Sequence, residues 1–314
     1  MRILFVTSTR LGDAVLSTGL LDHLIAAHPA ARITVVCGPV AEGVFARMPN
    51  RERTIILAKR SLGRHWPPLW AETATTLWDL VVDIRGSALS WLVPTRRRAV
   101  FRRTQGPKIA QLGAILNLSP PPLPVAWIGA PDRFWITQRL RTGRPIIALA
   151  PTANWQPKVW PPDRFAAVFN LLSHSFATGA EAVVLGGPGS AEAAMAAPLL
   201  AALPRAIDLV GKLSLPEVAA CLERSALFIG NDSGLMHLAA AAGAPTIGLF
   251  GPTDAATYAP AGAKAVAVEG QGGHMTAISV QQVAAAAETL LAQGRTILIN
   301  ASSVAATSRP VVSS

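Results

Sequence analysis

The chain has 314 residues, of which 51% are hydrophobic and 15% charged, a composition that describes a folded globular protein and excludes extensive disorder. At this length, two domains of about 150 residues each are expected. The two cysteines, Cys37 and Cys221, lie far apart in the sequence, which argues against a disulfide framework and a cysteine-based metal site and favours a reducing compartment.

The formal net charge of +10 is concentrated in the first half of the chain. Between Arg47 and Lys108 there are thirteen Lys and Arg residues against four Asp and Glu residues, a net charge of +9. Such a segment attracts polyanions, whether nucleic acid, anionic lipid or a phosphorylated substrate; alternatively it is a solvated basic face. Because no nucleic-acid-binding motif accompanies the charge, nucleic acid is not expected as a partner.

The apolar runs do not predict export or membrane insertion. The opening run ILFV is too short for a signal peptide. No stretch reaches the roughly 18 to 20 uncharged apolar residues of a membrane-spanning helix. The sequence therefore predicts a cytoplasmic protein.

In chain order, short runs rich in Val, Ile and Leu alternate twice with helix-like stretches. The first series predicts strands at 2–7, 32–37, 54–58 and 79–84 and a helix at 12–28. The second predicts strands at 145–151, 181–187, 226–230, 244–250 and 264–268, with helices at 164–179, 190–203, 213–225, from about 233 and at 280–294. Such alternation is typical of parallel βαβ units. We therefore predict an α/β protein with two Rossmann-like domains, at 1–143 and 144–299, whose parallel sheets face each other across a cleft, followed by a flexible tail at 300–314.

In open α/β sheets, ligand-binding groups collect in the loops that follow the carboxyl ends of the strands. The first such loop, TSTRLGDAVLS, places Asp13 at the start of a helix, directly after Gly12. This carboxylate either caps the helix or faces the cleft as a general base. Arg10 beside it either holds a phosphate or reaches solvent.

The second loop, PTANWQPKVWPPDRF, contains Thr152, Asn154 and Lys158. Small polar residues with one lysine suit an anionic group; the alternative is a connecting loop whose two tryptophans fill a domain interface. The helix that follows is expected to open at Pro161–Pro162, since proline is favoured in the first turn.

The third loop, GNDSG, joins a strand to the helix-like LMHLAAAAG. The unpaired N–H groups and positive dipole end of a helix start suit a diphosphate. Ser233 and Gly234 allow its close approach, and His237 is one turn further on; alternatively His237 is a core residue. The alanines predict that this helix packs closely against its sheet.

Several common catalytic motifs are absent from the sequence. There is no H-E-x-x-H, G-x-S-x-G, Walker A or CxxC pattern, and VLGGPGSAE does not fit the dinucleotide fingerprint. Metal-dependent, serine-hydrolase and P-loop chemistry are therefore not expected, and we predict no metal and no cofactor other than the substrates.

Four stretches together resemble glycosyltransferase family 9, the ADP-heptose:lipopolysaccharide heptosyltransferases and their relatives. They are RILFVTSTRLGDAVLSTGLLDHL, the PTANWQPKVWPPDRF loop, VVLGGPGSAE and LFIGNDSGLMHLAAAAGAPTIGLFGPTD. The resemblance implies a GT-B fold in which the first domain binds mainly the acceptor and the second binds the nucleotide-sugar. It also implies that the terminal helix at 279–293 crosses back toward the first domain.

The resemblance assigns roles to the residues of the three loops. Asp13 matches the family's proposed catalytic base, and Lys158 matches the lysine near the phosphates of the sugar donor. The residues expected to bind the sugar donor are Thr152, Asn154, Lys158, Asp232, Ser233, Gly234 and His237. The residues expected to bind the acceptor are Thr9, Arg10, Gly12, Arg60, Arg64, Arg97 and Arg98.

The implied function is an inverting, metal-independent transfer of heptose from ADP-heptose to an anionic glycolipid such as the lipopolysaccharide inner core. The basic segment suits such an acceptor and implies peripheral contact with the inner face of the cytoplasmic membrane. Arg10 stands where relatives often have serine, and VEGQGGHMTAIS replaces a cysteine-containing segment. Two alternatives stay open: a non-catalytic nucleotide-sugar-binding protein of the same fold, and a family member that uses another nucleoside-diphosphate sugar.

Overall fold

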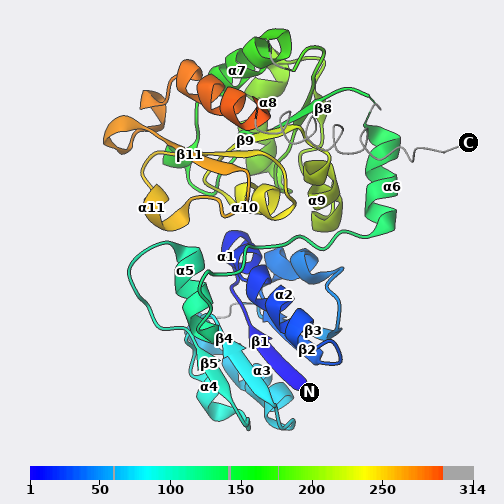
Figure 1. The fold of residues 1–314 in the computed structure, drawn as a ribbon, viewed down its shortest axis with the longest axis vertical. Coiled ribbons are helices and arrows are strands. Elements are labelled where there is room, and N and C mark those ends of the chain that lie inside the picture. Colours follow the sequence, from blue (N-terminus) through cyan, green and yellow to red (C-terminus); the bar gives the residue numbers. More distant parts are fainter. Residues whose placement is uncertain (59–60, 141–142, 176, 293–314) are drawn as a thin grey trace, which may run out of the picture.

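The computed structural model describes residues 1–58, 61–140, 143–175 and 177–292, which form two α/β domains stacked along the long axis of the molecule (Figure 1). The first sheet has the strand order β3-β2-β1-β4-β5 and the second has the order β11-β10-β9-β6-β7-β8. All the pairings within these two sheets are parallel. The predicted pair of Rossmann-like domains is therefore confirmed.

The first domain contains five strands, five α-helices and three short 3₁₀ helices among the described residues. The strands are β1 (Arg2–Val6), β2 (Arg32–Cys37), β3 (Arg51–Ile56), β4 (Leu80–Asp83) and β5 (Arg98–Val100). The helices are α1 (Leu11–Leu16), α2 (Thr18–Ala27), η1 (Pro39–Phe45), η2 (Ser61–Gly63), α3 (Trp66–Ala74), α4 (Leu89–Leu92), α5 (Lys108–Gly113) and η3 (Ala114–Leu116).

Two features of this domain differ from the sequence prediction. The helix predicted at 12–28 is two helices that meet at Ser17, whose hydroxyl donates to the carbonyl of Ala14 at 2.7 Å. Such hydroxyl-to-carbonyl bonds bend helices, which explains the break. Strand β5 was not predicted, because it lies in the basic run RRRAVFRR; its position at the sheet edge leaves Arg98 exposed to solvent.

The second domain follows the same plan. Its strands are β6 (Ile146–Ala150), β7 (Glu181–Val184), β8 (Ile207–Asp208), β9 (Leu227–Asn231), β10 (Thr246–Phe250) and β11 (Ala265–Glu269). The helices between and after them are η4 (Gln156–Lys158), α7 (Pro162–Ser175), α8 (Ser190–Ala202), α9 (Leu215–Glu223), α10 (Gly234–Ala241), α11 (Ala255–Tyr258), η5 (Gln271–Gly273), η6 (Met275–Ala277) and the helical residues 280–292. Helix α7 begins at the predicted prolines.

The apolar core is continuous between the domains. One cluster of buried residues includes Phe5 of the first domain together with Phe228 and Met236 of the second. Cys37 and Cys221 are buried and free, and burial raises the pKa of each thiol to about 12, as expected of cysteines with a packing role. No helix in the described ranges is both long enough and apolar enough to cross a membrane.

Helix α6 (Ala130–Arg139) connects the domains. It precedes the predicted boundary at residues 143 and 144, yet it packs beside α9 of the second domain (Figure 1). Arg133 donates to both carboxylate oxygens of Glu223 on α9, at 2.7 and 2.8 Å. At the start of α6, the carboxylate of Asp132 accepts two hydrogen bonds of 2.8 Å from Arg47 of the first domain. The predicted boundary therefore follows a helix that contacts both domains.

The last described helix, residues 280–292, packs on the second domain. Its buried residues Val283, Ala287 and Leu290 belong to the cluster that contains Trp160 and Phe165. The sequence analysis predicts that this helix crosses back toward the first domain. In the structure its apolar face packs on the second domain. The predicted tail at 300–314 lies outside the described residues.

Candidate functional site

The N-termini of α1 and α10 meet where the two domains face each other (Figure 1). Two glycines allow this approach. A Cβ atom added to Gly12 would lie 2.9 Å from Cδ2 of His237, and one added to Gly234 would lie 2.6 Å from Cγ of Leu11. Contacts this short are essentially never made by real Cβ atoms. The first and third predicted loops therefore lie side by side across the domain boundary.

Asp13 is the third residue of α1 and is half-buried. Among the described residues no side chain makes a capping hydrogen bond to this helix, while Asp13 is the acidic residue of its first turn. One carboxylate oxygen, Oδ2, accepts a long hydrogen bond of 3.3 Å from the hydroxyl of Ser8. The carboxylate therefore keeps most of its capacity to accept a proton or hydrogen bond from a substrate hydroxyl.

Among the residues described, two buried polar atoms at the start of α10 find no hydrogen-bond partner: Oγ of Ser233 and Nδ1 of His237. Ser233 is the N-cap residue of α10, but its hydroxyl makes no capping bond to the helix. A buried polar group left unsatisfied costs about 1–3 kcal/mol. Together with the unpaired N–H groups of the first helical turn, these two atoms form a site that an anion would complete.

His237 is uncharged at neutral pH. Burial lowers the pKa of His237 to about 4, while the negative charges of Asp232 and Asp13 act in the opposite direction and the positive charge of Lys158 adds to the shift. The ring also packs against Gly12. His237 is therefore both a core residue, as one alternative held, and a group that faces the charged residues of all three loops.

Lys158 and Asp232 form a largely buried ion pair. Nζ of Lys158 donates to Oδ2 of Asp232 at 2.6 Å, and the two side chains are only 17% and 10% exposed. The hydroxyl of Thr253 donates to the same oxygen at 2.8 Å. Lys158 lies in η4 after β6, Asp232 follows β9, and Thr253 follows β10, so three neighbouring strands contribute to this cluster. Sequence reasoning missed Thr253, although it lies in the FGPTD stretch that carried part of the resemblance.

The second loop is held in place by Asn231, which was also missed. This buried residue at the end of β9 accepts a hydrogen bond of 3.0 Å from the N–H of Trp160 and donates one of 3.4 Å to the carbonyl of Thr152. Thr152 is buried, whereas Asn154 is exposed. Trp160 fills the core of the second domain and not the domain interface, which corrects the alternative for this loop.

The residues expected to bind the acceptor are not gathered in one place. Thr9 and Arg10 share the loop after β1 with Asp13, while Arg64 is exposed near α3. Arg97 and Arg98 lie at the amino end of β5, where Arg98 donates to the carbonyl of Ser90 at 2.8 Å. Because the sheet is parallel, that end is opposite the edge that carries Asp13. Arg60 lies outside the described residues.

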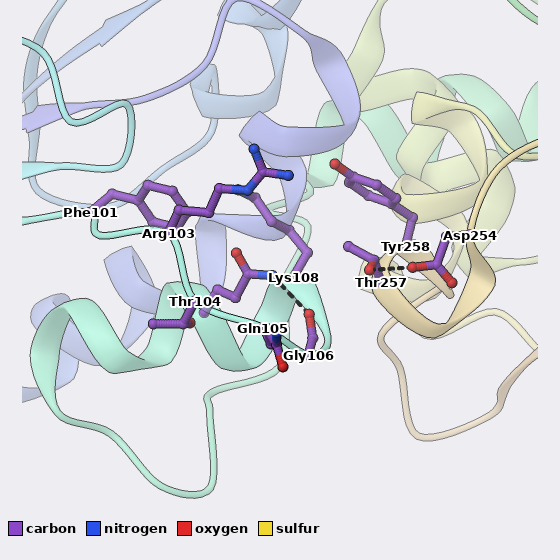
Figure 2. A pocket seen from close by; sticks show the side chains of 10 residues that line it. Phe101, Arg103, Thr104, Gln105, Gly106, Lys108, Asp254, Thr257 and Tyr258 are labelled. Carbon is purple, nitrogen blue, oxygen red and sulfur yellow. Dashed lines mark hydrogen bonds between the residues drawn. The ribbon is translucent and has the colours of Figure 1, made fainter.

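A cavity of about 590 Å³ lies between the segment after β5 of the first domain and helix α11 of the second (Figure 2). Arg103 and Lys108 line it from the first domain, and Thr257 and Tyr258 line it from the second. In Figure 2 the guanidinium of Arg103 and the phenol of Tyr258 point into the same space from opposite sides.

Lys108 connects this cavity with the catalytic candidate. Its ammonium lies 4.2 Å from the centre of the Phe101 ring, a cation–π contact. Burial lowers the pKa of Lys108, the negative charge of Asp13 opposes this shift, and the positive charge of Arg103 adds to it. The cavity therefore holds two cations, of which Lys108 is close enough to Asp13 to feel its charge. Arg103 and Lys108 follow the carboxyl end of β5, and the sequence analysis does not name them because it does not predict that strand.

Among the residues that the structure describes, no three His, Cys, Asp or Glu side chains are grouped as a metal site requires. The positive groups of the site are instead Lys158, Lys108, Arg103 and the N-terminus of α10.

Comparisons with known proteins give the site its context. The model of the family described as "Glycosyltransferase family 9 (heptosyltransferase)" matches residues 78–287. "Lipooligosaccharide heptosyltransferase 2" of Haemophilus influenzae is 25% identical over 85% of this chain and 88% of that protein. "Lipopolysaccharide heptosyltransferase 3" of Escherichia coli is 35% identical, but that match spans 38% of this chain and only 34% of the relative.

A solved structure described as "E. coli heptosyltransferase WaaC with ADP" superposes with a TM-score of 0.73, covers 92% of this chain and 100% of that chain, and is 19% identical. It shows that the fold is GT-B. Because the family model covers well over half of the sequence and the expected loops surround one site, the chain belongs to glycosyltransferase family 9, the heptosyltransferase family, and is a glycosyltransferase.

Proposed function

We propose that the protein transfers a heptose from ADP-heptose to a hydroxyl of an anionic glycolipid of the lipopolysaccharide inner-core type, with inversion at the anomeric carbon. The observation that carries this proposal is the pair of unpartnered buried atoms, Oγ of Ser233 and Nδ1 of His237, at the start of α10 and opposite Asp13. The names of similar proteins support heptose as the transferred sugar and ADP as the leaving nucleotide. The residues of the site support the proposed transfer mechanism.

The sugar donor's diphosphate is proposed to lie at the N-terminus of α10. The N–H groups of the first turn and the hydroxyl of Ser233 donate hydrogen bonds to its oxygens. The ammonium of Lys158, oriented by its ion pair with Asp232, is proposed to donate a further hydrogen bond to the diphosphate. These groups stabilise the negative charge that develops on the leaving diphosphate, so the proposed mechanism requires no divalent metal ion.

Asp13 is proposed to be the general base. The acceptor hydroxyl attacks the anomeric carbon from the face opposite the diphosphate, its proton passes to Asp13, and the carbon–oxygen bond to the diphosphate breaks with its electron pair leaving on ADP. Because attack and departure occur on opposite faces, the configuration inverts. The position of Asp13 on the other domain, across from α10, supports this division of roles.

The acceptor is proposed to enter through the 590 Å³ cavity. Arg103 and Lys108 suit a phosphate or carboxylate on the acceptor sugar, and Tyr258 offers a ring face and a hydroxyl for the sugar itself. Helix α11 thus adds a second-domain wall to a site that the family resemblance assigned mainly to the first domain.

The test is a transfer assay with purified protein, ADP-heptose and an inner-core acceptor in the presence of EDTA. Asp13→Asn keeps the size and polarity of the side chain but cannot accept the proton, so the turnover rate should fall by about 10²-fold or more. The affinity for ADP should change by no more than a few-fold, because the phosphate site lies on the second domain. A variant that transfers at the normal rate would refute the role of Asp13.

Two binding measurements beside the transfer assay separate the remaining alternatives. Binding of ADP-heptose without transfer by the wild-type protein would indicate a non-catalytic binding protein. A rise in melting temperature with UDP or GDP in place of ADP would retain the fold and mechanism but replace the sugar donor.

A further inference from the structure

The first domain exposes three large apolar side chains on two adjacent short helices. Trp91 and Leu92 on α4 are 63% and 62% exposed, and Trp70 on α3 is 46% exposed. They form one surface, because the indole N–H of Trp70 donates to the carbonyl of Leu92 at 2.9 Å. Helices α3 and α4 lie at the end of the first domain that is remote from the second domain (Figure 1).

Arginines border this apolar surface. The guanidinium carbon of Arg98 lies 5.3 Å from the centre of the Trp91 ring, a cation–π contact. Arg96 and Arg97 precede it and are exposed, and Arg96 pairs with Asp79 at 3.5 Å while its own side chain remains 70% exposed. Exposed indole rings beside arginines are the composition that settles at the boundary between lipid headgroups and acyl chains.

We propose that this surface, made of Trp70, Trp91, Leu92, Arg96, Arg97 and Arg98 and called here the docking face, binds the surface of a membrane that contains anionic lipids. The apolar side chains enter the headgroup region, while the arginines stay at the level of the lipid phosphates. The clustered positive charge favours an anionic lipid surface over a neutral one. None of these residues is needed for the chemistry at Asp13, so the docking face is separate from the catalytic site.

The docking face is connected to the cavity by strand β5. Arg98, a residue of the docking face, begins this strand, whereas Phe101 and Arg103, just after its end, line the cavity. Three residues of extended chain span about 10 Å. A glycolipid anchored in the same membrane would therefore have to extend its sugar along β5 to reach the cavity, which lies at the sheet end opposite the docking face. This last step rests on the proposed function; the lipid binding itself does not.

The experiment is vesicle flotation of the purified full chain with phosphatidylglycerol-containing vesicles and with pure phosphatidylcholine vesicles. Wild-type protein should float with the anionic vesicles, and binding should weaken as salt is raised. Trp91→Ser combined with Leu92→Ser should lower the partition coefficient at least tenfold. Phe134→Ser, which removes an equally exposed aromatic side chain (66% exposed) from α6 on the second-domain side, is the matched control and should bind like wild type.

Two further measurements keep the outcome unambiguous. Melting temperatures and ADP affinities should be equal for all variants, which excludes misfolding. Transfer to a water-soluble, deacylated acceptor should be unchanged in the Trp91/Leu92 variant, whereas transfer to acceptor embedded in vesicles should fall. Absence of wild-type flotation, or equal flotation of the variant, would overturn the docking face. So would sedimentation data in which the same substitutions dissolve a dimer, because the surface would then bind a second copy of the chain.

Discussion

Replacing Gly234 by alanine is expected to slow transfer without harming the helix that contains it. Alanine has a higher helix propensity than glycine, so α10 itself should lose no stability. The new Cβ, however, would lie 2.6 Å from Cγ and 2.7 Å from Cβ and Cδ2 of Leu11, across the domain boundary. Since non-bonded carbon atoms are about 3.5–4.0 Å apart at best contact, α1 and α10 must separate by about 1 Å.

The separation sets the magnitude of the effect. Overpacking of this kind costs about 1–3 kcal/mol, part of which is relieved when the domains move apart. A misplacement of about 1 Å between reacting groups costs about 10²-fold in rate. Asp13 is on α1 and the proposed phosphate site is on α10, so the separation falls between them. We expect kcat to drop about 100-fold and the affinity for ADP to change little, because the phosphate site lies within one domain.

The assay compares initial rates of the wild-type protein, Gly234→Ala, Leu11→Gly and the double variant, with ADP affinities measured by calorimetry. Leu11→Gly removes all three atoms that the new methyl group would meet, so the double variant should recover at least tenfold over Gly234→Ala. If Gly234→Ala transfers normally, or if the double variant is no faster, the helix contact does not control the position of the base.

Three further outcomes are expected. Because burial lowers the pKa of His237 to about 4, the unfolded chain binds this proton first as pH falls; stability in urea titrations should therefore decline between about pH 6.5 and 4, and decline less in His237→Gln. Lys158→Met leaves the buried carboxylate of Asp232 without its cation, so transfer should fall about 10²–10³-fold and the free energy of unfolding by about 3 kcal/mol, with partial recovery in Lys158→Arg. Arg103→Ala and Lys108→Ala should raise KM for an anionic acceptor about tenfold or more while the Kd for ADP stays constant, and an effect on ADP alone would contradict the acceptor role of the cavity.

Much of the fold follows from the sequence because buried parallel strands are continuous apolar runs. IIALA at 146–150 and LFIG at 227–230 leave little choice of structure, and both are central strands of the second sheet. The rule that binding groups follow the carboxyl ends of strands then selected Asp13, Lys158 and Asp232. The structure brings these three residues to one boundary, where each contributes to the electrostatic environment of His237.

The residues that line the cavity could not be predicted from the sequence, for a physical reason. Strand β5 is an edge strand of only three residues, Arg98–Val100, and arginines flank it on both sides, so no apolar run is long enough to predict a strand. Without β5, Arg103 and Lys108 were not recognised as following a strand end, and the arginines at 97 and 98 were chosen in their place. Tyr258 was missed because it comes from the opposite domain. Which loops face each other depends on the close contact at Gly12 and Gly234, and neither glycine's partner is a sequence neighbour.

The two aspartates of the site illustrate what local sequence leaves open. Asp13 and Asp232 both follow a strand and stand next to a helix start, so spacing alone does not say which accepts the proton. In the structure, Oδ2 of Asp232 already accepts hydrogen bonds from Lys158 and Thr253, at 2.6 and 2.8 Å. Protonating it would leave the lysine's charge uncompensated in a largely buried position, a costly state. Within the described part of the chain, Asp13 accepts only the 3.3 Å bond from Ser8, so protonating it disrupts no ion pair there. The difference in partners, not in sequence context, favours Asp13 as the proposed base and Asp232 as the residue that positions Lys158.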